Sequence, residues 1–284
     1  ATALMQLWEA EAFALDDAVE DVVDFSASHP SFATPFTYRM LLAHASSIVD
    51  SGQLNNWYQY GNMDPSISLY DAVSGYLDPG GAYYGSDNFS NAEPGTSYSY
   101  PNVGYAFVGL LAQIHGGQDF AELTRATIFE PLAMAHTAWR LADFDLDTLA
   151  MPYRYENGTY TPLQHYTFAD YPNGALRASA CDVARFFASQ AAGGAPVLEP
   201  ETLALMQTPT YPGLDGTQGL GWYEEFIGPG MWLGHSGSEQ GVFTEAFYRT
   251  SDGVGFVLLT NSEGDDDYAI YDVEDLLIAW GETL

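Results

Sequence analysis

Apolar side chains recur at helical spacing through the first two thirds of the chain. The clearest stripe extends over 103–114 and ends at two glycines, which predicts a helix with a glycine C-cap. Shorter helices are predicted over 37–45 and 68–77. The segment 179–182 has the capping-box pattern, with a serine followed three positions later by an acidic residue, so another helix is predicted from there through 187.

After about residue 213 the pattern changes to short β-rich runs. Strands are predicted over 231–233, 242–248 and 254–260, and Ser251-Asp252-Gly253 between the last two is a hairpin signal. Apolar positions over 269–280 then predict a final helix. Helices followed by an antiparallel meander and a covering helix indicate the α+β class.

This order of elements also predicts two domains. Residues 1–15 and 208–284 are expected to form an α/β sheet domain, incomplete at its N-terminus, and residues 16–207 a mostly helical domain. The stretch 78–100 is rich in Gly, Asn, Pro and Tyr and is too long for a simple connection, so we expect it to form part of a site.

Charge narrows the range of partners. The 284 residues include 38 acidic and 7 basic ones, every basic residue is Arg, and the net charge is −31. Such a charge repels phosphate backbones and anionic membrane surfaces, so no nucleic-acid partner is predicted. No apolar run approaches the ~18–20 residues that a membrane span needs. Self-repulsion on this scale also suggests adaptation to salt, which screens it.

Metal and cofactor chemistry finds little support in the sequence. A single cysteine, Cys181, excludes an internal disulfide and a zinc site built on several cysteines, and we expect it to be a small buried hydrophobe. The histidines outside position 235 lack metal-ligand spacing. The acidic run 263–267 lacks the calcium-loop pattern and is expected to be a solvated turn. No cofactor and no metal are predicted.

Two short segments carry candidate chemistry. Tyr100 and Asn102 stand two positions apart in the turn before the helix over 103–114, where a phenol and an amide can point into one cleft. The second segment is His235-Ser236-Gly237-Ser238, which we place at a strand edge. Small residues there let a substrate lie against the strand, and free backbone N–H groups can hold a developing oxyanion.

At these residues the chain resembles the class C β-lactamase-like, penicillin-binding serine hydrolase family, in its esterase and D-peptidase branch. Tyr100-Pro101-Asn102 resembles the family's Tyr-x-Asn element, and His235-Ser236-Gly237 resembles its Lys-Thr-Gly element in the His-x-Gly form. Further similar segments occur in the family's order, at 41–46, 129–134, 219–222 and 258–261. The resemblance implies a β-lactamase/transpeptidase-like fold and a periplasmic or secreted location.

One departure from the family is large. Its Ser-x-x-Lys motif, which opens the first long helix, cannot occur in a chain without Lys. The two strands that precede that helix in the family are missing as well, and residues 4–8 run at helical period with no N-cap signal before them. We therefore expect the nucleophile upstream of Ala1, and we expect that N-terminal segment to cover the exposed sheet as a partner.

The resemblance assigns a role to each candidate residue. The absent Ser would attack a carbonyl, Tyr100 would act as general base and then acid, and Asn102 would orient the substrate. The backbone N–H of Ser238 would supply half of the oxyanion hole. His235 is mostly neutral at pH 7, so it anchors a substrate carboxylate less well than Lys would. An ester, amide or peptide substrate is therefore favoured over a β-lactam.

Two other interpretations stay open. Gly234-His235-Ser236-Gly237-Ser238 is one residue short of the Gly-x-Ser-x-Gly nucleophile elbow, which would make Ser236 the nucleophile. That elbow needs a strand, a sharp turn and a helix, whereas more strand is predicted here. The second alternative is a non-catalytic binding protein on the same fold, because fold alone does not establish function.

Overall fold

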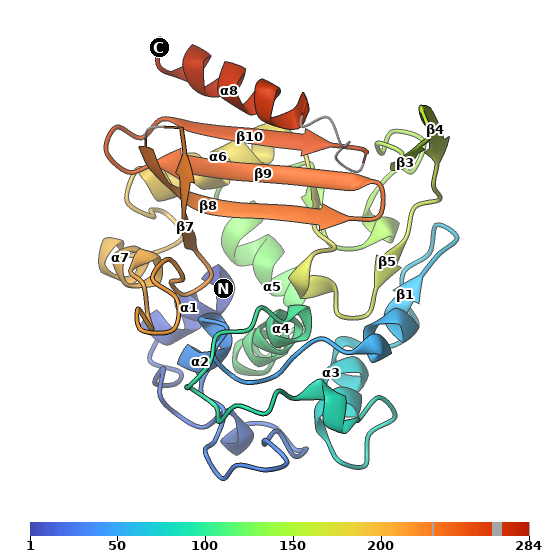
Figure 1. Ribbon diagram of the computed structural model, residues 1–284, viewed down its shortest axis with the longest axis vertical. Coiled ribbons are helices and arrows are strands. Elements are labelled where there is room, and N and C mark those ends of the chain that lie inside the picture. The colour runs from blue at the N-terminus through green and yellow to red at the C-terminus, as the bar shows by residue number, and fades with distance from the viewer. Residues whose placement is uncertain (229, 263–268, 284) are drawn as a thin grey trace.

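A helical layer lies below a four-stranded antiparallel sheet in the computed structural model, which describes residues 1–228, 230–262 and 269–283 (Figure 1). The α-helices are α1 (Thr2–Glu9), α2 (Tyr38–Leu42), α3 (Leu69–Leu77), α4 (Asn102–Gly116), α5 (Phe120–Thr124), α6 (Ala180–Ala191), α7 (Pro200–Gln207) and α8 (Ala269–Gly281). The π-helical η4 (Arg125–Phe129) extends α5, and short 3-10 helices occupy Val19–Asp21, Gly52–Trp57, Ser86–Asn88, Leu141–Asp143 and Tyr171–Asn173.

The main sheet has the order β10-β9-β8-β7. Its strands are β7 (Tyr223–Ile227), β8 (Gly230–Glu239), β9 (Val242–Arg249) and β10 (Gly255–Thr260), and each pairs antiparallel with the next. Three smaller pairs are β1 (Tyr58–Gln59) with β5 (Thr167–Phe168), β2 (Thr137–Ala138) with β6 (Arg177–Ala178), and β3 (Tyr153–Glu156) with β4 (Thr159–Pro162). The predicted meander, its hairpin and the α+β class are confirmed.

Both faces of the main sheet carry helices, because strand side chains alternate between the faces. Tyr248 belongs to the main core and meets Phe187 of α6. Trp232, Phe247 and Phe256 form a separate cluster under α8. Residues of α1, α4 and the sheet belong to the same hydrophobic core, so the two predicted domains share one core. The boundaries between these domains remain a prediction.

The buried side of α8 differs from the stripe that the sequence predicts. Leu277 packs on the sheet, but Leu276 and Trp280 are 69% and 64% exposed. Glu274, which is 6% exposed, takes a place on the buried side instead. The periodicity places an apolar face on α8, but only packing decides how α8 is rotated about its axis.

The predicted helix starts are accurate, with two corrections. Ser68 and Ser179 accept hydrogen bonds from the backbone N–H three residues on, as expected. In a capping box, the side chain three positions after the N-cap accepts a hydrogen bond from the backbone N–H of the N-cap residue. The carboxylate of Asp182 instead accepts hydrogen bonds from the N–H of His136 and the hydroxyl of Thr137. Cys181 is exposed, and the expectation of a buried cysteine is wrong, because the first turn of α6 presents that position to solvent.

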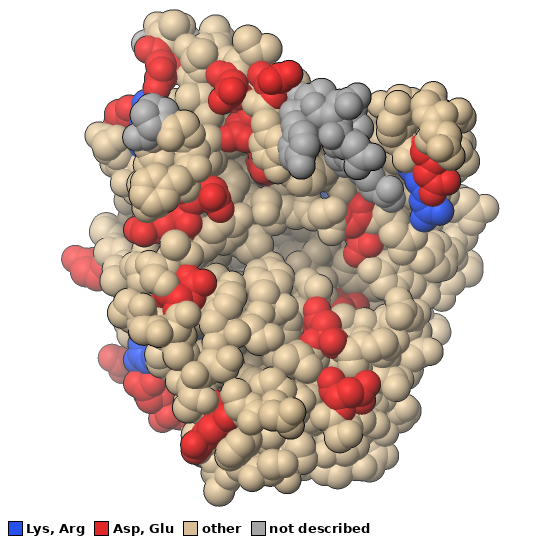
Figure 2. Space-filling model, viewed as in Figure 1, with Lys and Arg blue, Asp and Glu red and all other residues tan. Residues whose placement is uncertain are grey.

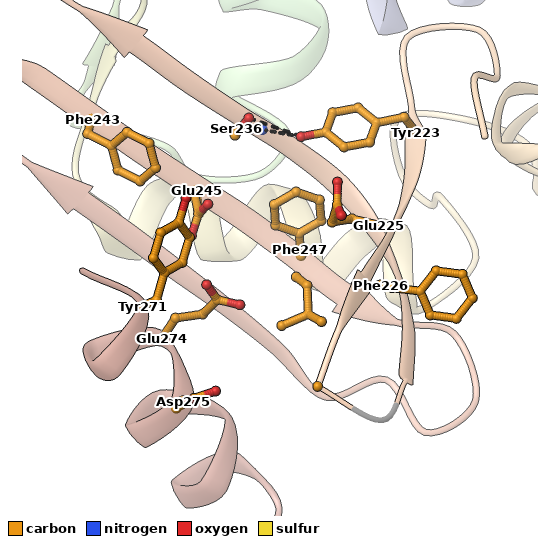
Figure 3. A pocket seen from close by; sticks show the side chains of 12 residues that line it. Tyr223, Glu225, Phe226, Ser236, Phe243, Glu245, Phe247, Tyr271, Glu274 and Asp275 are labelled. Atoms are coloured by element: carbon orange, nitrogen blue, oxygen red, sulfur yellow. Dashed lines mark hydrogen bonds between the residues drawn. The ribbon is translucent and has the colours of Figure 1, made fainter. Parts of the chain in front are cut away.

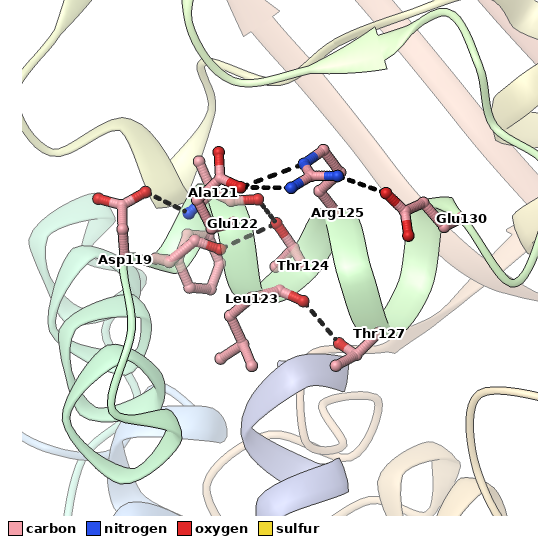
Figure 4. Close-up of polar contacts among 9 residues, drawn as sticks. Asp119, Ala121, Glu122, Leu123, Thr124, Arg125, Thr127 and Glu130 are labelled. Atoms are coloured by element: carbon pink, nitrogen blue, oxygen red, sulfur yellow. Dashed lines mark hydrogen bonds and ion pairs between the residues drawn. The ribbon is translucent and has the colours of Figure 1, made fainter.

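Arginines neutralise only a small part of the negative charge. Six of the seven form ion pairs with acidic groups among the described residues. Arg125 binds both Glu122 on α5 and Glu130 just after η4 (Figure 4). Acidic patches therefore far outnumber basic ones on the face in Figure 2, which is hollowed between the sheet and the helical layer. The acidic run 263–267 lies outside the described residues, and no described helix is long and apolar enough to cross a membrane.

Candidate active site

Tyr100 and His235 meet between the helical layer and the sheet. Tyr100 stands two residues before α4, and His235 lies near the middle of β8. The hydroxyl oxygen of Tyr100 is 3.3 Å from Nε2 of His235, across 135 positions of sequence. The phenol and the small-residue strand predicted from the sequence therefore face each other.

The hydrogen bonds of His235 define its tautomer. Its Nδ1 lies 2.6 Å from the backbone oxygen of Ser236, and a carbonyl oxygen can only accept, so Nδ1 carries the proton. Nε2 is then the acceptor, and the hydroxyl of Tyr100 donates to it. Burial lowers the pKa of His235, and the hydrogen bond to the backbone oxygen of Ser236 partly opposes this effect. The imidazole is therefore neutral at pH 7.

Tyr100 is also neutral at pH 7. Partial burial, with smaller contributions from Tyr98, Tyr223 and Asp50, raises the pKa of Tyr100 to about 12. Behind it lies His44, which is 2% exposed and whose ring centroid is 4.2 Å from that of Tyr100. Burial lowers the pKa of His44 to about 3. The His44 ring thus packs against the tyrosine ring from behind.

Asn102 is held by a residue that the sequence analysis missed. Asp50 accepts hydrogen bonds from the side-chain amide and the backbone N–H of Asn102, both at 2.8 Å, and from the N–H of Val103 at 3.0 Å. Its carboxylate thus caps α4, where the helix dipole favours negative charge. Asp50 stands 52 positions away in sequence, so no local spacing could have revealed this contact.

The strand edge beside His235 is open over a short length. β7 pairs with 230–234 only, whereas β9 pairs with β8 as far as Glu239. Beyond β7, the N–H of Ser236 donates to the hydroxyl of Tyr223 at 3.1 Å. The N–H of Ser238 faces the same edge, because N–H groups two residues apart in a strand point the same way. Gly237 faces Thr244, whose Oγ1 would lie 2.8 Å from an added Cβ.

Ser236 and His235 face opposite sides of the sheet. The hydroxyl of Ser236 lies 3.0 Å from that of Tyr223, which the sequence analysis also missed, and lines a pocket next to α8. β8 continues past Ser236 and turns directly into β9, without a helix. The nucleophile-elbow interpretation of this serine is therefore wrong.

The amino end of α1 lies beside the same cleft. A Cβ added to Gly221, whose φ is +84°, would lie 2.4 Å from the Cβ of Ala1 and 3.0 Å from the hydroxyl of Tyr105. That hydroxyl donates to the backbone oxygen of Leu42 at 2.8 Å. The ring of Tyr105 also stacks on His44, which lies against Tyr100, so the first turn of α1 lies near the Tyr100–His235 pair.

This architecture defines a protein of the β-lactamase/transpeptidase-like fold, as the family resemblance implies. Comparison with known proteins agrees: the family model described as Beta-lactamase matches residues 1–279. "Penicillin-binding protein 4" of Amycolatopsis lactamdurans is 30% identical over 280 residues, a match covering 92% of this chain and 69% of the relative. The chain therefore belongs to the Beta-lactamase family.

Solved structures share the fold at lower identity. The octameric penicillin-binding protein homologue from Pyrococcus abyssi is 24% identical with a TM-score of 0.73, and the match covers 98% of this chain and 64% of that one. The D-amino acid amidase from Ochrobactrum anthropi SV3 is 19% identical with a TM-score of 0.76, covering 99% and 80%. This chain thus spans less than two thirds of the Pyrococcus protein.

Proposed function

We propose that this chain forms the substrate cleft of a serine hydrolase that cleaves an ester, amide or peptide through an acyl-enzyme. The observation that supports this most directly is the 3.3 Å contact between Tyr100 and His235 beside an open strand edge. The family includes penicillin-binding proteins, and a D-amino acid amidase shares its fold. The cleft is therefore consistent with acyl transfer.

In the proposed reaction, the attacking serine transfers its proton to the oxygen of Tyr100 while Tyr100 passes its own proton to Nε2 of His235. This relay suits the tautomer, because Nε2 is an acceptor and the phenol is neutral. In the second step the protons return and protonate the leaving group. The N–H of Ser238 stabilises the oxyanion, and Asn102, positioned by Asp50, binds the substrate.

The nucleophile and its lysine are proposed to come from a segment preceding Ala1. The chain contains no Lys, so it cannot hold a Ser-x-x-Lys motif. A segment continuing α1 backward would start beside Gly221 and near the Tyr100–His235 pair. The exposed apolar side chains of α8, Leu276 and Trp280, agree with a covering segment on the sheet domain.

Charge around the cleft favours a neutral or cationic substrate. His235 is neutral at pH 7 and cannot replace a lysine as a carboxylate anchor. Asp50 and Glu239 lie close enough to the buried Asp170 to raise the pKa of that carboxyl, so negative charges gather on this side of the cleft. We therefore place ester and peptide hydrolysis ahead of β-lactam hydrolysis.

Labelling with a fluorophosphonate tests the assignment. The protein isolated from its source is treated with the probe, and the modified peptide is identified by mass spectrometry. We expect the label on a serine outside residues 1–284, and no label on the 284-residue chain expressed alone. Modification of a serine within the chain would contradict the proposal.

A non-catalytic binding protein is the second candidate. It is favoured by the absence of lysine and by the raised pKa of Tyr100, because no cation is among the described groups that shift the pKa of that phenol. A source protein that binds substrate analogues in the cleft but takes up no label would support this candidate.

A further inference from the structure

A second pocket lies on the opposite face of the sheet from His235, between β7, β9 and α8. Its volume is about 460 Å³, a size that suits a small ligand. Carboxylates and aromatic rings line it together, among them Glu225, Glu245, Glu274, Phe247 and Tyr271 (Figure 3). The proposed hydrolysis gives none of these side chains a role.

Glu245 is the most unusual group in this pocket. It is 9% exposed, and its Oε2 is buried without a hydrogen-bond partner among the described residues. The carboxyl group of Glu274, 6% exposed, shares a hydrogen bond with Glu245. A buried carboxylate oxygen left without a partner is costly, so a positively charged ligand that reaches Oε2 would remove this cost.

The lining indicates what kind of cation fits. Among the described residues, no group of three or more His, Cys, Asp or Glu side chains is arranged to hold a metal ion. Aromatic rings do surround the carboxylates: Phe247 lies on the strand of Glu245, and Tyr271 lies one turn before Glu274 on α8. Carboxylates combined with ring faces recognise ammonium groups that carry carbon substituents.

We propose that this pocket binds an organic ammonium ion, with the charged group at the Glu245–Glu274 pair and the carbon chain against Phe247 and Tyr271. Glu225 lies near enough to Glu245 to raise its pKa. Glu225 therefore adds to the negative potential that attracts the cation to the Glu245–Glu274 pair. This site is independent of the reaction in the Tyr100–His235 cleft.

Binding should release a proton near neutral pH. Burial, together with Glu245, raises the pKa of Glu274 to about 7, so the empty pair retains a proton there. The groups facing this pair are Tyr223 and Glu225 from β7 and Tyr271 and Asp275 from α8, none of them a cation. A bound ammonium group favours the fully ionised pair, so affinity increases from pH 6 to pH 8.

Calorimetric titration of the full-length protein with 1,4-diaminobutane tests the site, at an ionic strength fixed with KCl and with 1,4-butanediol as the neutral control. We expect saturable binding of the amine only, with one ligand per chain. Glu245→Gln should weaken binding at least tenfold. Glu225→Gln, at an exposed position that folding tolerates, should weaken it several-fold.

The matched control is Glu224→Gln, the same change in charge on the same strand but on its other face. It should leave the affinity unchanged. Equal weakening by Glu224→Gln and Glu225→Gln would mean that the amine only condenses on an acidic surface, and would overturn the proposal. Absence of saturable binding would also overturn it, whatever the outcome of the fluorophosphonate experiment.

Discussion

Asp50 accepts hydrogen bonds from both the side chain and the backbone of Asn102, each at 2.8 Å. One carboxylate thus caps α4 and fixes the direction of an amide beside the candidate active site. Because the N-cap residue of α4 is Pro101, which provides no side-chain cap, the helix depends on this distant group. Fold stability and site geometry are coupled at this contact.

Replacing Asp50 should therefore affect both stability and function. Asp50→Ala is expected to lower the free energy of unfolding by about 1–2 kcal/mol, the usual effect of losing a helix cap. Asp50→Asn keeps an accepting oxygen and should lose less. Urea unfolding measures both, with Asp147→Ala on the exposed surface as a control for the change in charge. Equal effects at positions 50 and 147 would contradict the capping role.

Tyr100→Phe should remove the proton relay while leaving the packing intact. In the full-length protein we expect the hydrolysis rate of a p-nitrophenyl ester to fall by ~10²–10⁴-fold. Tyr98→Phe is the matched control, because its hydroxyl contacts Gln218 instead of His235. The melting temperature of each variant shows whether it folds. An unchanged rate in a folded Tyr100→Phe variant would exclude the proposed role.

His235→Lys should shift substrate preference toward anionic β-lactams. A lysine supplies a charged donor for a carboxylate, worth roughly 1.5–3 kcal/mol, so the kcat/KM for nitrocefin relative to a neutral ester should rise about tenfold to a hundredfold. Steady-state kinetics on the full-length protein measures this ratio. Efficient nitrocefin hydrolysis by the unaltered protein would refute the preference inferred from a neutral His235.

Asp170 should make stability fall as pH rises. Burial raises its pKa to about 7 from the ordinary value of 3.8, so between these two pH values the folded protein holds a proton that the unfolded chain has lost. The free energy of unfolding therefore decreases from about pH 4 to pH 7. Asp170→Asn removes this dependence, and its stability relative to the unaltered protein should improve by at least about 1 kcal/mol between pH 4.5 and pH 8. If the free energy of unfolding changes with pH in the same way in Asp170→Asn and in the unaltered protein, the assignment to Asp170 is contradicted.

Salt should stabilise the fold. With a net charge of −31 and six of seven arginines already paired, most acidic groups repel one another without compensation. The screening length falls from ~10 Å at 0.1 M salt to ~3 Å at 1 M, so the melting temperature should rise mainly below about 1 M NaCl. Calorimetry across this range measures the effect. An unchanged melting temperature would remove the evidence for salt adaptation.

The sequence alone determined the α+β order of elements, the helix at 103–114 and the meander at the end of the chain. These features depend on local periodicity and on turn residues, which neighbours in sequence supply. It did not predict β7 as a strand, because Glu224 and Glu225 interrupt its apolar pattern. Pairing with β8 stabilises that strand in spite of its composition.

The sequence also supplied Tyr100 and His235 as candidate residues, but only the tertiary structure brought them within 3.3 Å of each other. The same holds for Asp50 on Asn102, for the rotation of α8 and for the pocket around Glu245. Each of these depends on contacts between segments that are distant in the chain. Local sequence patterns do not predict such contacts, because these contacts form only when the whole chain packs.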